Sequence, residues 1–312
     1  MQSLSKKKLL FKYIPITIGI VLFISLILWV GTFEMYDALS NAKLEYLFAA
    51  VFSYIIAIFV RSQKLHIILN LFTSDLTRKK SFYYYAISTF LASITPGRMG
   101  EPLIVALVKK KEGVLIRNLM PMLVFDRIID FLIIMIYAMA GSIIISSDVF
   151  NDIILKYTHN IAFILLILFI LSLFLISIMI IIKKYIHFPI NDLKKGFEEI
   201  SKTPVKLIHI FLFTFLGWLP EILSMYFVMK SFGINISYIQ TLSIFSIGIL
   251  AGVISMVPGG TGTSELSMVV LATSLKFPPG LSTTAFVVNK ILLFSTIVIL
   301  GIIAKNQISK SN

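Results

Sequence analysis

The sequence predicts an all-α integral membrane protein: a polytopic helical bundle with inverted repeats, six full spans and two re-entrant helical hairpins. Three observations lead to this class: long apolar segments, an uneven distribution of Lys and Arg, and a Pro-Gly-x-x-Gly motif that occurs twice. Of the 312 residues, 58% are hydrophobic and only 14% are charged, whereas a soluble domain carries about 25% charged residues. A water-soluble core could not bury this much apolar surface, and contact with lipid removes that difficulty.

Six apolar segments are long enough to cross the hydrocarbon core of a bilayer, which takes about 20 helical residues. They are Tyr13–Val30, Leu44–Val60, Leu119–Ile145, Ile161–Ile182, Ile208–Val228 and Thr283–Ala304. No signal-peptide cleavage site follows the first segment, so we expect it to be a retained helix.

Two further apolar stretches are interrupted by Pro-Gly, which ends a helix because proline clashes with the preceding turn and lacks an amide donor. The interruptions separate Phe82–Ile94 from Pro102–Val108, and Ile239–Val257 from Ser264–Leu275. Each half is too short to cross the membrane, so both stretches are predicted to enter the membrane and return.

The basic residues predict the orientation. Segments 1–12, 61–81, 109–118, 183–207 and 305–312 contain 21 of the 28 Lys and Arg residues. The segments predicted on the opposite side contain Lys43, Lys156, Lys230 and Lys276. Positively charged loops stay in the cytoplasm, so we expect a multi-pass protein of the cytoplasmic membrane with both termini cytoplasmic. The net charge of +13 reflects this bias and does not indicate nucleic-acid binding.

An internal repeat divides this single transmembrane domain. The motif at 96–101 (PGRMGE) recurs in outline at 258–262 (PGGTG), with Glu265 following. The predicted repeats are 44–145, with its hairpin at 82–108, and 208–304, with its hairpin at 239–275. A connecting helix and a basic cytoplasmic loop occupy 161–207. The topology reverses the direction of the second repeat, as in many secondary transporters.

Eight ionisable residues lie within or beside the apolar spans, where each costs about 2.5–3.5 kcal/mol near a helix centre. They are Arg98, Glu101, Asp126, Arg127, Asp130, Glu221, Glu265 and Lys290. They are expected to face one another, backbone dipoles or water. Three are positive and five negative, which requires a protonated carboxylate or a bound cation. A simpler interpretation makes Asp126, Arg127 and Asp130 structural ion pairs between helices.

The hairpin breaks are the predicted ligand site. The return helices begin near Pro102 and Ser264, with Thr263 or Ser264 as an N-cap. Helix N-termini favour an anion such as phosphate, and glycines let the backbone approach it, although tight turns alone also explain glycines. The predicted substrate-binding residues are Pro96, Gly97, Arg98, Gly100, Glu101, Asp126, Arg127, Asp130, Glu221, Pro258, Gly259, Gly260, Gly262, Glu265 and Lys290.

These motifs resemble the flippase-like transmembrane family, which includes the membrane domain of the bacterial lysylphosphatidylglycerol synthase/flippase. The resemblance is carried by 95–101 (TPGRMGE), by Asp126-Arg127 with Asp130, and by 258–262 with Glu265. It extends from about Leu44 to Ala304 and implies lipid translocation by the paired hairpins. Many relatives have Glu-Arg at 126–127 and arginine at 290, and both differences keep the charge. Only eight residues follow Ala304, so no lipid-aminoacylating activity is expected.

The predicted function is a lipid flippase that moves a phospholipid or a polyprenyl-phosphate-linked headgroup across the cytoplasmic membrane. The expected partners are this lipid or lipid-linked glycan and anionic inner-leaflet lipids, and homodimer formation stays open. We found no catalytic signature and expect no cofactor or metal; the absence of cysteine excludes thiolate chemistry. Two alternatives stay open: a membrane-embedded transferase for lipid-linked sugars, with a divalent metal on Asp126 and Asp130, and a proton- or ion-coupled transporter of a small solute.

Overall fold

The computed structural model describes residue 17 and residues 19–71, 76–95, 100, 103–114, 116–145, 202–255 and 257–310. All the secondary-structure elements in these ranges are helices, and no strand occurs in them. The all-α class predicted from hydropathy is therefore confirmed for the described part of the chain. The predicted span Ile161–Ile182 and the basic loop after it lie outside the described residues.

Eight of the described helices form two sets of four. The first set comprises α3 (Leu44–Leu69), α4 (Arg78–Ser93), α5 (Leu103–Glu112) and α6 (Ile116–Ile145). The second set comprises α10 (Pro204–Ser231), α11 (Tyr238–Ile254), α12 (Thr263–Ser274) and α13 (Pro279–Lys310). Their lengths are 26, 16, 10 and 30 residues in the first set and 28, 17, 12 and 32 in the second. In both sets, two short helices thus lie in the sequence between two long ones.

A bent pair of helices precedes the first set. The helix Gly19–Val30 is followed by α2 (Thr32–Ser40), and the two axes differ by 75°. Gly31 lies between them with φ of 88°, a backbone conformation that favours glycine because it has no Cβ. The prediction placed 31–43 in a loop, so α2 is an element that hydropathy did not indicate.

Local sequence signals explain where several helices begin. Ser237 accepts a hydrogen bond from the Gln240 amide at 3.2 Å, while the Gln240 side chain accepts one from the Ser237 amide at 2.9 Å. This capping box satisfies amides that the first turn of α11 would leave unpaired. Thr77 caps α4 in a similar way, by accepting from the Lys80 amide at 3.3 Å.

Three described helices are long and apolar enough to cross a membrane, namely α3, α10 and α13, and the bent pair makes a fourth if it is one span. The predicted C-terminal boundary of the span that begins at Leu44 is wrong. The predicted span ended at Val60, whereas α3 continues to Leu69 and keeps Arg61 and Lys64 inside the helix. The helix continues past Val60 because Arg61 and Lys64 both form ion pairs with buried carboxylates. Their charges therefore do not mark the start of a loop.

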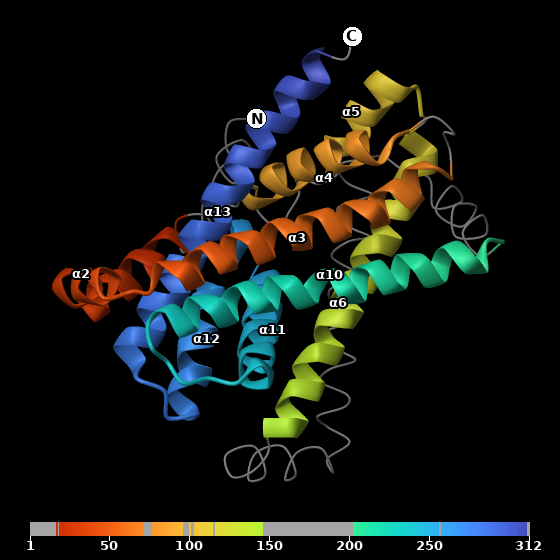
Figure 1. The fold of residues 1–312 in the computed structure, drawn as a ribbon. Helices are drawn as coiled ribbons and strands as arrows, with labels where there is room; N and C mark the ends of the chain where they lie inside the picture. Colours follow the sequence, from red (N-terminus) through yellow and green to blue (C-terminus); the bar gives the residue numbers. More distant parts are fainter. Residues whose placement is uncertain are drawn as a thin grey trace, which may run out of the picture.

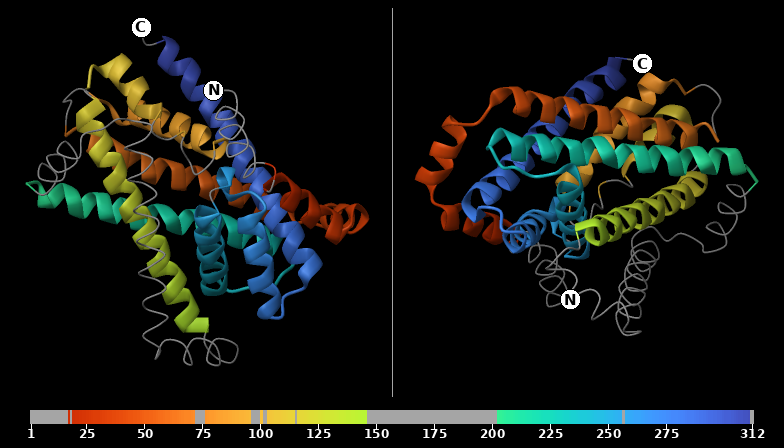
Figure 2. Two further views of the ribbon diagram at one scale, coloured as in Figure 1. Left: turned by 180° about the vertical axis from the view of Figure 1, so that it is seen from behind. Right: turned by 60° about the horizontal axis from the view of Figure 1, so that its bottom comes forward.

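Helices of the first set pack against helices of the second set. Helices α3 and α10 lie side by side along their length (Figures 1 and 2). They are antiparallel, because the Lys43 amide before α3 donates to the Ser231 carbonyl at the end of α10 at 3.0 Å. Helix α6 of the first set packs on α11 of the second, and α13 of the second packs on α4 of the first. The two sets are therefore interlocked.

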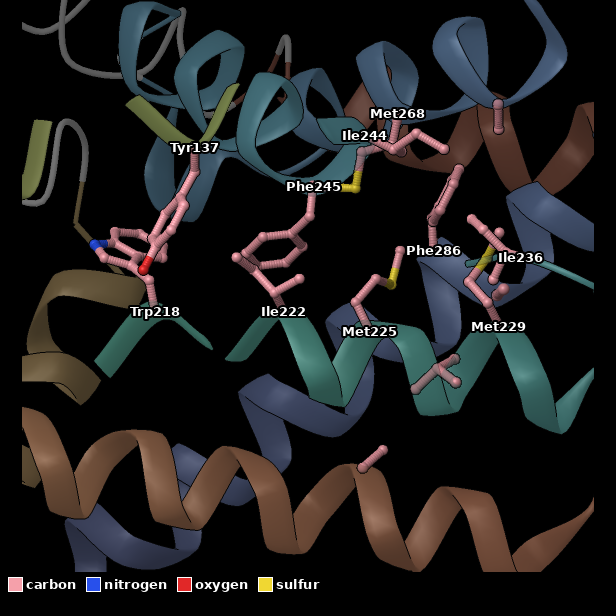
Figure 3. Close-up of a cluster of buried hydrophobic side chains, with 14 of the residues drawn as sticks. Tyr137, Trp218, Ile222, Met225, Met229, Ile236, Ile244, Phe245, Met268 and Phe286 are labelled. Carbon is pink, nitrogen blue, oxygen red and sulfur yellow. The ribbon is translucent and has the colours of Figure 1, made fainter. Parts of the chain in front are cut away.

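The main apolar core lies between α10 and the second hairpin. Ile222, Met225 and Met229 extend from α10 toward Phe245 of α11 and Phe286 of α13, and all five are at most 2% exposed (Figure 3). Their spacing on α10 follows the i, i+3 and i+7 positions of one helical face. This packing holds the hairpin against the α3–α10 pair.

The outer face of α3 is apolar and its inner face is partly polar. Phe48, Phe52 and Phe59 are 74%, 65% and 54% exposed. On the opposite face, Arg61 and Lys64 are buried. A soluble protein would place these groups the other way round, so the pattern fits a helix with lipid outside and a polar interior.

Candidate functional site

A four-residue charge cluster joins α3 to α6. The Lys64 Nζ atom lies 2.6 Å from Asp126 Oδ1 and 3.1 Å from Asp130 Oδ1. The Arg127 guanidinium lies 2.5 Å from Asp126 Oδ2 and 2.7 Å from Asp130 Oδ2. The two carboxylates share one helical face, as their i,i+4 spacing predicted. Each is thus bracketed by two cations, and the cluster is electrically neutral.

A second ion pair joins α3 to α10. Arg61 lies 2.6 Å from Glu221 Oε2, and its guanidinium carbon stands 4.0 Å from the centre of the Trp218 ring. Gly217 allows this approach, because a Cβ there would lie 2.5 Å from Arg61 Cγ. Figure 3 shows Trp218 beside Tyr137, at the end of the apolar core. The charge of Arg61 is therefore held between an indole face and a carboxylate at the interface of the two helix sets.

Arg61 and Lys64 correct the charge balance expected from the sequence. Both were assigned to an inner loop, but Lys64 is 1% exposed and Arg61 is 7% exposed. With them included, the ion pairs that involve Asp126, Asp130, Glu221 and Glu265 join four cations to these four carboxylates. A protonated carboxylate or a bound cation is no longer required. The helical spacing of Ala57, Arg61 and Leu65 would have placed Arg61 on the inner face had the helix been extended past Val60.

The break of the second hairpin is a tight turn of glycines. A short 3-10 helix, η4 (Pro258–Gly260), follows α11, and Gly259, Gly260 and Gly262 have φ of 58°, 67° and 83°. Lys290 of α13 donates to the Gly259 carbonyl at 2.5 Å and lies 3.2 Å from Glu265 Oε1. One cation thus satisfies a carbonyl freed by the break and a buried carboxylate at once.

The start of α12 differs from the prediction. The N-cap is Gly262, not Thr263 or Ser264, and the Gly262 amide donates to Glu265 Oε2 at 2.5 Å. Thr263 instead donates from its hydroxyl to the Gly260 carbonyl at 3.0 Å. The chain's own carboxylate therefore lies where the sequence predicted an external anion. A Glu three residues after the cap reaches back to the amide of the cap residue, which would otherwise be free.

The turn between α11 and α12 lies against the end of α4. A Cβ on Gly259 would lie 3.2 Å from the carbonyl oxygen of Ser93, the last residue of α4, and 3.9 Å from Lys290 Nζ. At the first break, the Gly100 amide donates to Thr95 Oγ1 at 2.6 Å. The predicted residues Pro96, Gly97, Arg98 and Glu101 lie outside the described residues, so their roles stay predictions.

The partly exposed cations mark where a ligand could reach the ion pairs. The side chains of Arg127 and Lys290 are 25% and 24% exposed, whereas those of Asp126 and Glu265 are 7% and 4% exposed. An anionic or oxygen-rich headgroup could therefore contact the cations without displacing the carboxylates.

The carboxylates are poorly arranged for a metal. Asp126 and Asp130 each face Lys64 and Arg127, and these cations repel a divalent ion from the same oxygens. Within the described residues, no group of three or more His, Asp or Glu side chains could hold a metal ion. The geometry thus gives no support to the metal-dependent transferase alternative.

The sequence profile of the lysylphosphatidylglycerol synthase transmembrane region matches residues 16–301. The chain belongs to this family. The resemblance proposed from the hairpin motifs is confirmed, and the match begins earlier than Leu44 because it includes the helix Gly19–Val30. All the site residues discussed above fall within it.

Two archaeal relatives extend over nearly the whole chain. A UPF0104 membrane protein of Pyrococcus horikoshii is 22% identical, across 95% of this chain and 97% of its own length. A UPF0104 membrane protein of Methanothermobacter thermautotrophicus is also 22% identical, across 93% of this chain and 94% of its own length. Together with the apolar helices, these matches identify a membrane protein.

Proposed function

We propose that this protein is a lipid translocase of the cytoplasmic membrane that moves a phospholipid or a polyprenyl-phosphate-linked headgroup from one leaflet to the other. The observation that supports this most is the close approach of Ser93, at the end of α4, to Gly259 in the break after α11, beside Lys290. Broken helices that face each other inside the membrane free backbone polar groups at depth, and secondary transporters use such groups to bind substrates.

The proposal includes an inverted repeat, 44–145 and 208–304. Three features support it: the recurring order of helix lengths, the antiparallel α3–α10 pair, and the exchange in which α6 packs on α11 while α13 packs on α4. A pseudo-two-fold axis between the two sets would produce this arrangement, because the last long helix of each set packs on the hairpin of the other set.

The ion pairs provide a polar route through an apolar exterior. A lipid headgroup cannot cross hydrocarbon unaided, because burying an unpaired charge costs several kcal/mol or more. In our proposal, Arg127 and Lys290 contact the headgroup while its hydrocarbon chains stay in lipid. Rocking of one helix set against the other at the α3–α10 interface then exposes the headgroup to either leaflet in turn.

A reconstituted assay of fluorescent-lipid movement tests this function. Vesicles would contain labelled phosphatidylglycerol or a labelled polyprenyl phosphate, and an external quencher reports the fraction in each leaflet. We expect Lys290→Met to slow translocation at least tenfold, because the hairpin break loses its cation. The matched control is Lys305→Met, on the same helix but exposed to solvent. Arg98→Ala tests the first hairpin in the same way.

The alternatives give different results in the same vesicles. No movement of either lipid by the wild-type protein, or full activity of Lys290→Met, would contradict the translocase. Charge movement without lipid movement would indicate the ion-coupled transporter. Lipid modification that needs a divalent metal would indicate the transferase.

A further inference from the structure

We infer that the groove between the helix Gly19–Val30 and α12 binds one hydrocarbon chain of the lipid whose headgroup lies at the second hairpin break. The inference rests on the proposed function, which provides the headgroup position. The groove has a volume of about 540 Å³, within the roughly 300–1,000 Å³ of typical ligand pockets. Its main lining residues are Leu22, Leu26, Trp29, Leu266, Val269 and Val270.

The chemistry of the groove selects hydrocarbon. Leu26 and Val269 form a buried floor, at 6% and 5% exposure, while Trp29 and Val270 stand as walls at 60% and 57% exposure. None of the lining side chains is charged. The Ser274 hydroxyl at one edge donates to the Val270 carbonyl at 2.8 Å, so its donor is already used. Ser25 and Thr273 add hydroxyls to the lining, but the groove offers no charged side chain to a headgroup, whereas a methylene chain gains contact with two helices at once.

The groove begins at the hairpin break. Leu22 lines it, and a Cβ on Gly262 would lie 2.7 Å from Leu22 Cβ and 2.6 Å from the Gly19 carbonyl oxygen. The helix Gly19–Val30 therefore touches the turn whose next helix carries Glu265, the partner of Lys290. A lipid with its headgroup at Lys290 has this groove as the adjoining apolar surface.

The length of the groove suits one chain within one leaflet. From Leu22 to Trp29 the helix rises about 10 Å, compared with about 15 Å for half of the hydrocarbon core. The helix then bends by 75° into α2. Tryptophan is enriched where the hydrocarbon meets the headgroup layer, so Trp29 is placed to mark the outer end of the chain's path.

Photocrosslinking of a lipid chain tests the inference. The full-length protein would be reconstituted in vesicles that contain phosphatidylglycerol with a diazirine in one acyl chain, irradiated, and mapped by mass spectrometry. We expect labelling of Leu22–Trp29 and Leu266–Thr273 at least fivefold above the lipid-facing stripe of Phe48 and Phe52. Val270→Trp should fill the groove and reduce both this labelling and lipid translocation at least fivefold. The control is Ile302→Trp on α13, because Ile302 is similarly exposed at 53% but lies outside the groove.

The two readouts separate this inference from the proposed function. Equal labelling of the groove and the Phe48–Phe52 stripe would overturn the groove site even if the protein translocates lipid. Labelling of the groove with full translocation by Val270→Trp would overturn the link to the transported lipid. If Trp29→Cys instead forms a disulfide between two copies and the groove is not labelled, the groove is a dimer contact and the inference is wrong. Groove labelling without translocation by the wild-type protein would remove the proposed function and leave a lipid-chain site.

Discussion

Lys64 Nζ lies 2.6 Å from Asp126 Oδ1 and is the least exposed of the ion-paired cations, at 1% of its side-chain surface. It reaches Asp130 at 3.1 Å as well, so one cation on α3 neutralises part of two carboxylates on α6. Such a cluster is stable only as a whole, because removal of one member leaves an uncompensated charge in a low-dielectric interior.

Lys64→Met should therefore destabilise the protein by about 3–5 kcal/mol, the range for breaking a buried ion pair from one side. Thermal unfolding in detergent, followed by circular dichroism, measures the effect. The double variant Lys64→Met/Asp130→Asn should recover part of the loss, because it removes one negative charge together with the positive one. Lys305→Met, at an exposed position, serves as the control. Wild-type stability of Lys64→Met would show that Arg127 alone satisfies both carboxylates.

Gly217→Ala should weaken the α3–α10 interface. The added Cβ would lie 2.5 Å from Arg61 Cγ, so the arginine must leave the Trp218 face or the helices must separate. Overpacking of this kind costs about 1–3 kcal/mol. Gly280→Ala is the matched control, because its Cβ would meet only Glu34 Oε2 at 3.5 Å. Equal melting temperatures for the two variants would refute the tight contact between Gly217 and Arg61.

Glu265→Ala should be more damaging than Glu265→Gln. Alanine leaves both the Gly262 amide and Lys290 without their partner, whereas glutamine can still accept from the amide and loses only the charge. We expect about 3–5 kcal/mol of destabilisation for alanine and a smaller loss for glutamine, measured by thermal unfolding. Equal losses would mean that the ion pair with Lys290, and not the cap of α12, determines the role of Glu265, because both variants remove the negative charge.

Gly252→Ala should disturb the second hairpin, where α11 and α12 approach most closely. The new Cβ would lie 2.1 Å from Ser264 Oγ and 3.1 Å from the Gly260 Cα atom. We expect a loss of about 1–3 kcal/mol from this overpacking. The double variant Gly252→Ala/Ser264→Ala should regain most of it, because the closest atom is removed. No recovery in the double variant would place the conflict at Gly260 instead.

Cysteine labelling can test the predicted membrane topology. The chain contains no cysteine, so a single introduced cysteine is the only site that a thiol reagent would label. We expect Asn235→Cys to react with a membrane-impermeant maleimide added to intact cells, and Lys305→Cys to react only after the membrane is opened. Both positions are exposed. The opposite pattern would reverse the predicted orientation, and labelling of both from outside would contradict the odd number of spans predicted between them.

Hydropathy and proline were enough to predict the helical class and the breaks near Ser93 and Val257. These signals are local: a bilayer requires about 20 apolar residues per span, and a proline that follows an apolar helix prevents the helix from continuing. The resemblance depended on short motifs, and the match over residues 16–301 confirms it.

The ion pairs between residues far apart in the chain could not be predicted from the sequence. Arg61 and Lys64 look like the start of a charged loop, because local hydropathy cannot show that Asp126, Asp130 and Glu221 lie opposite them in space. For the same reason, the predicted charge imbalance and the predicted N-cap of α12, Thr263 or Ser264, were both wrong.

The sequence by itself determined that the chain is a membrane protein with helices broken at Pro-Gly, because those properties arise from solvent preference and backbone sterics within a few turns. Only the tertiary structure decided that α3 extends to Leu69, that Glu265 caps its own helix, and that the second break meets Ser93. A charge is tolerated inside a membrane only when a partner is near, and the distance to that partner is a property of the folded chain.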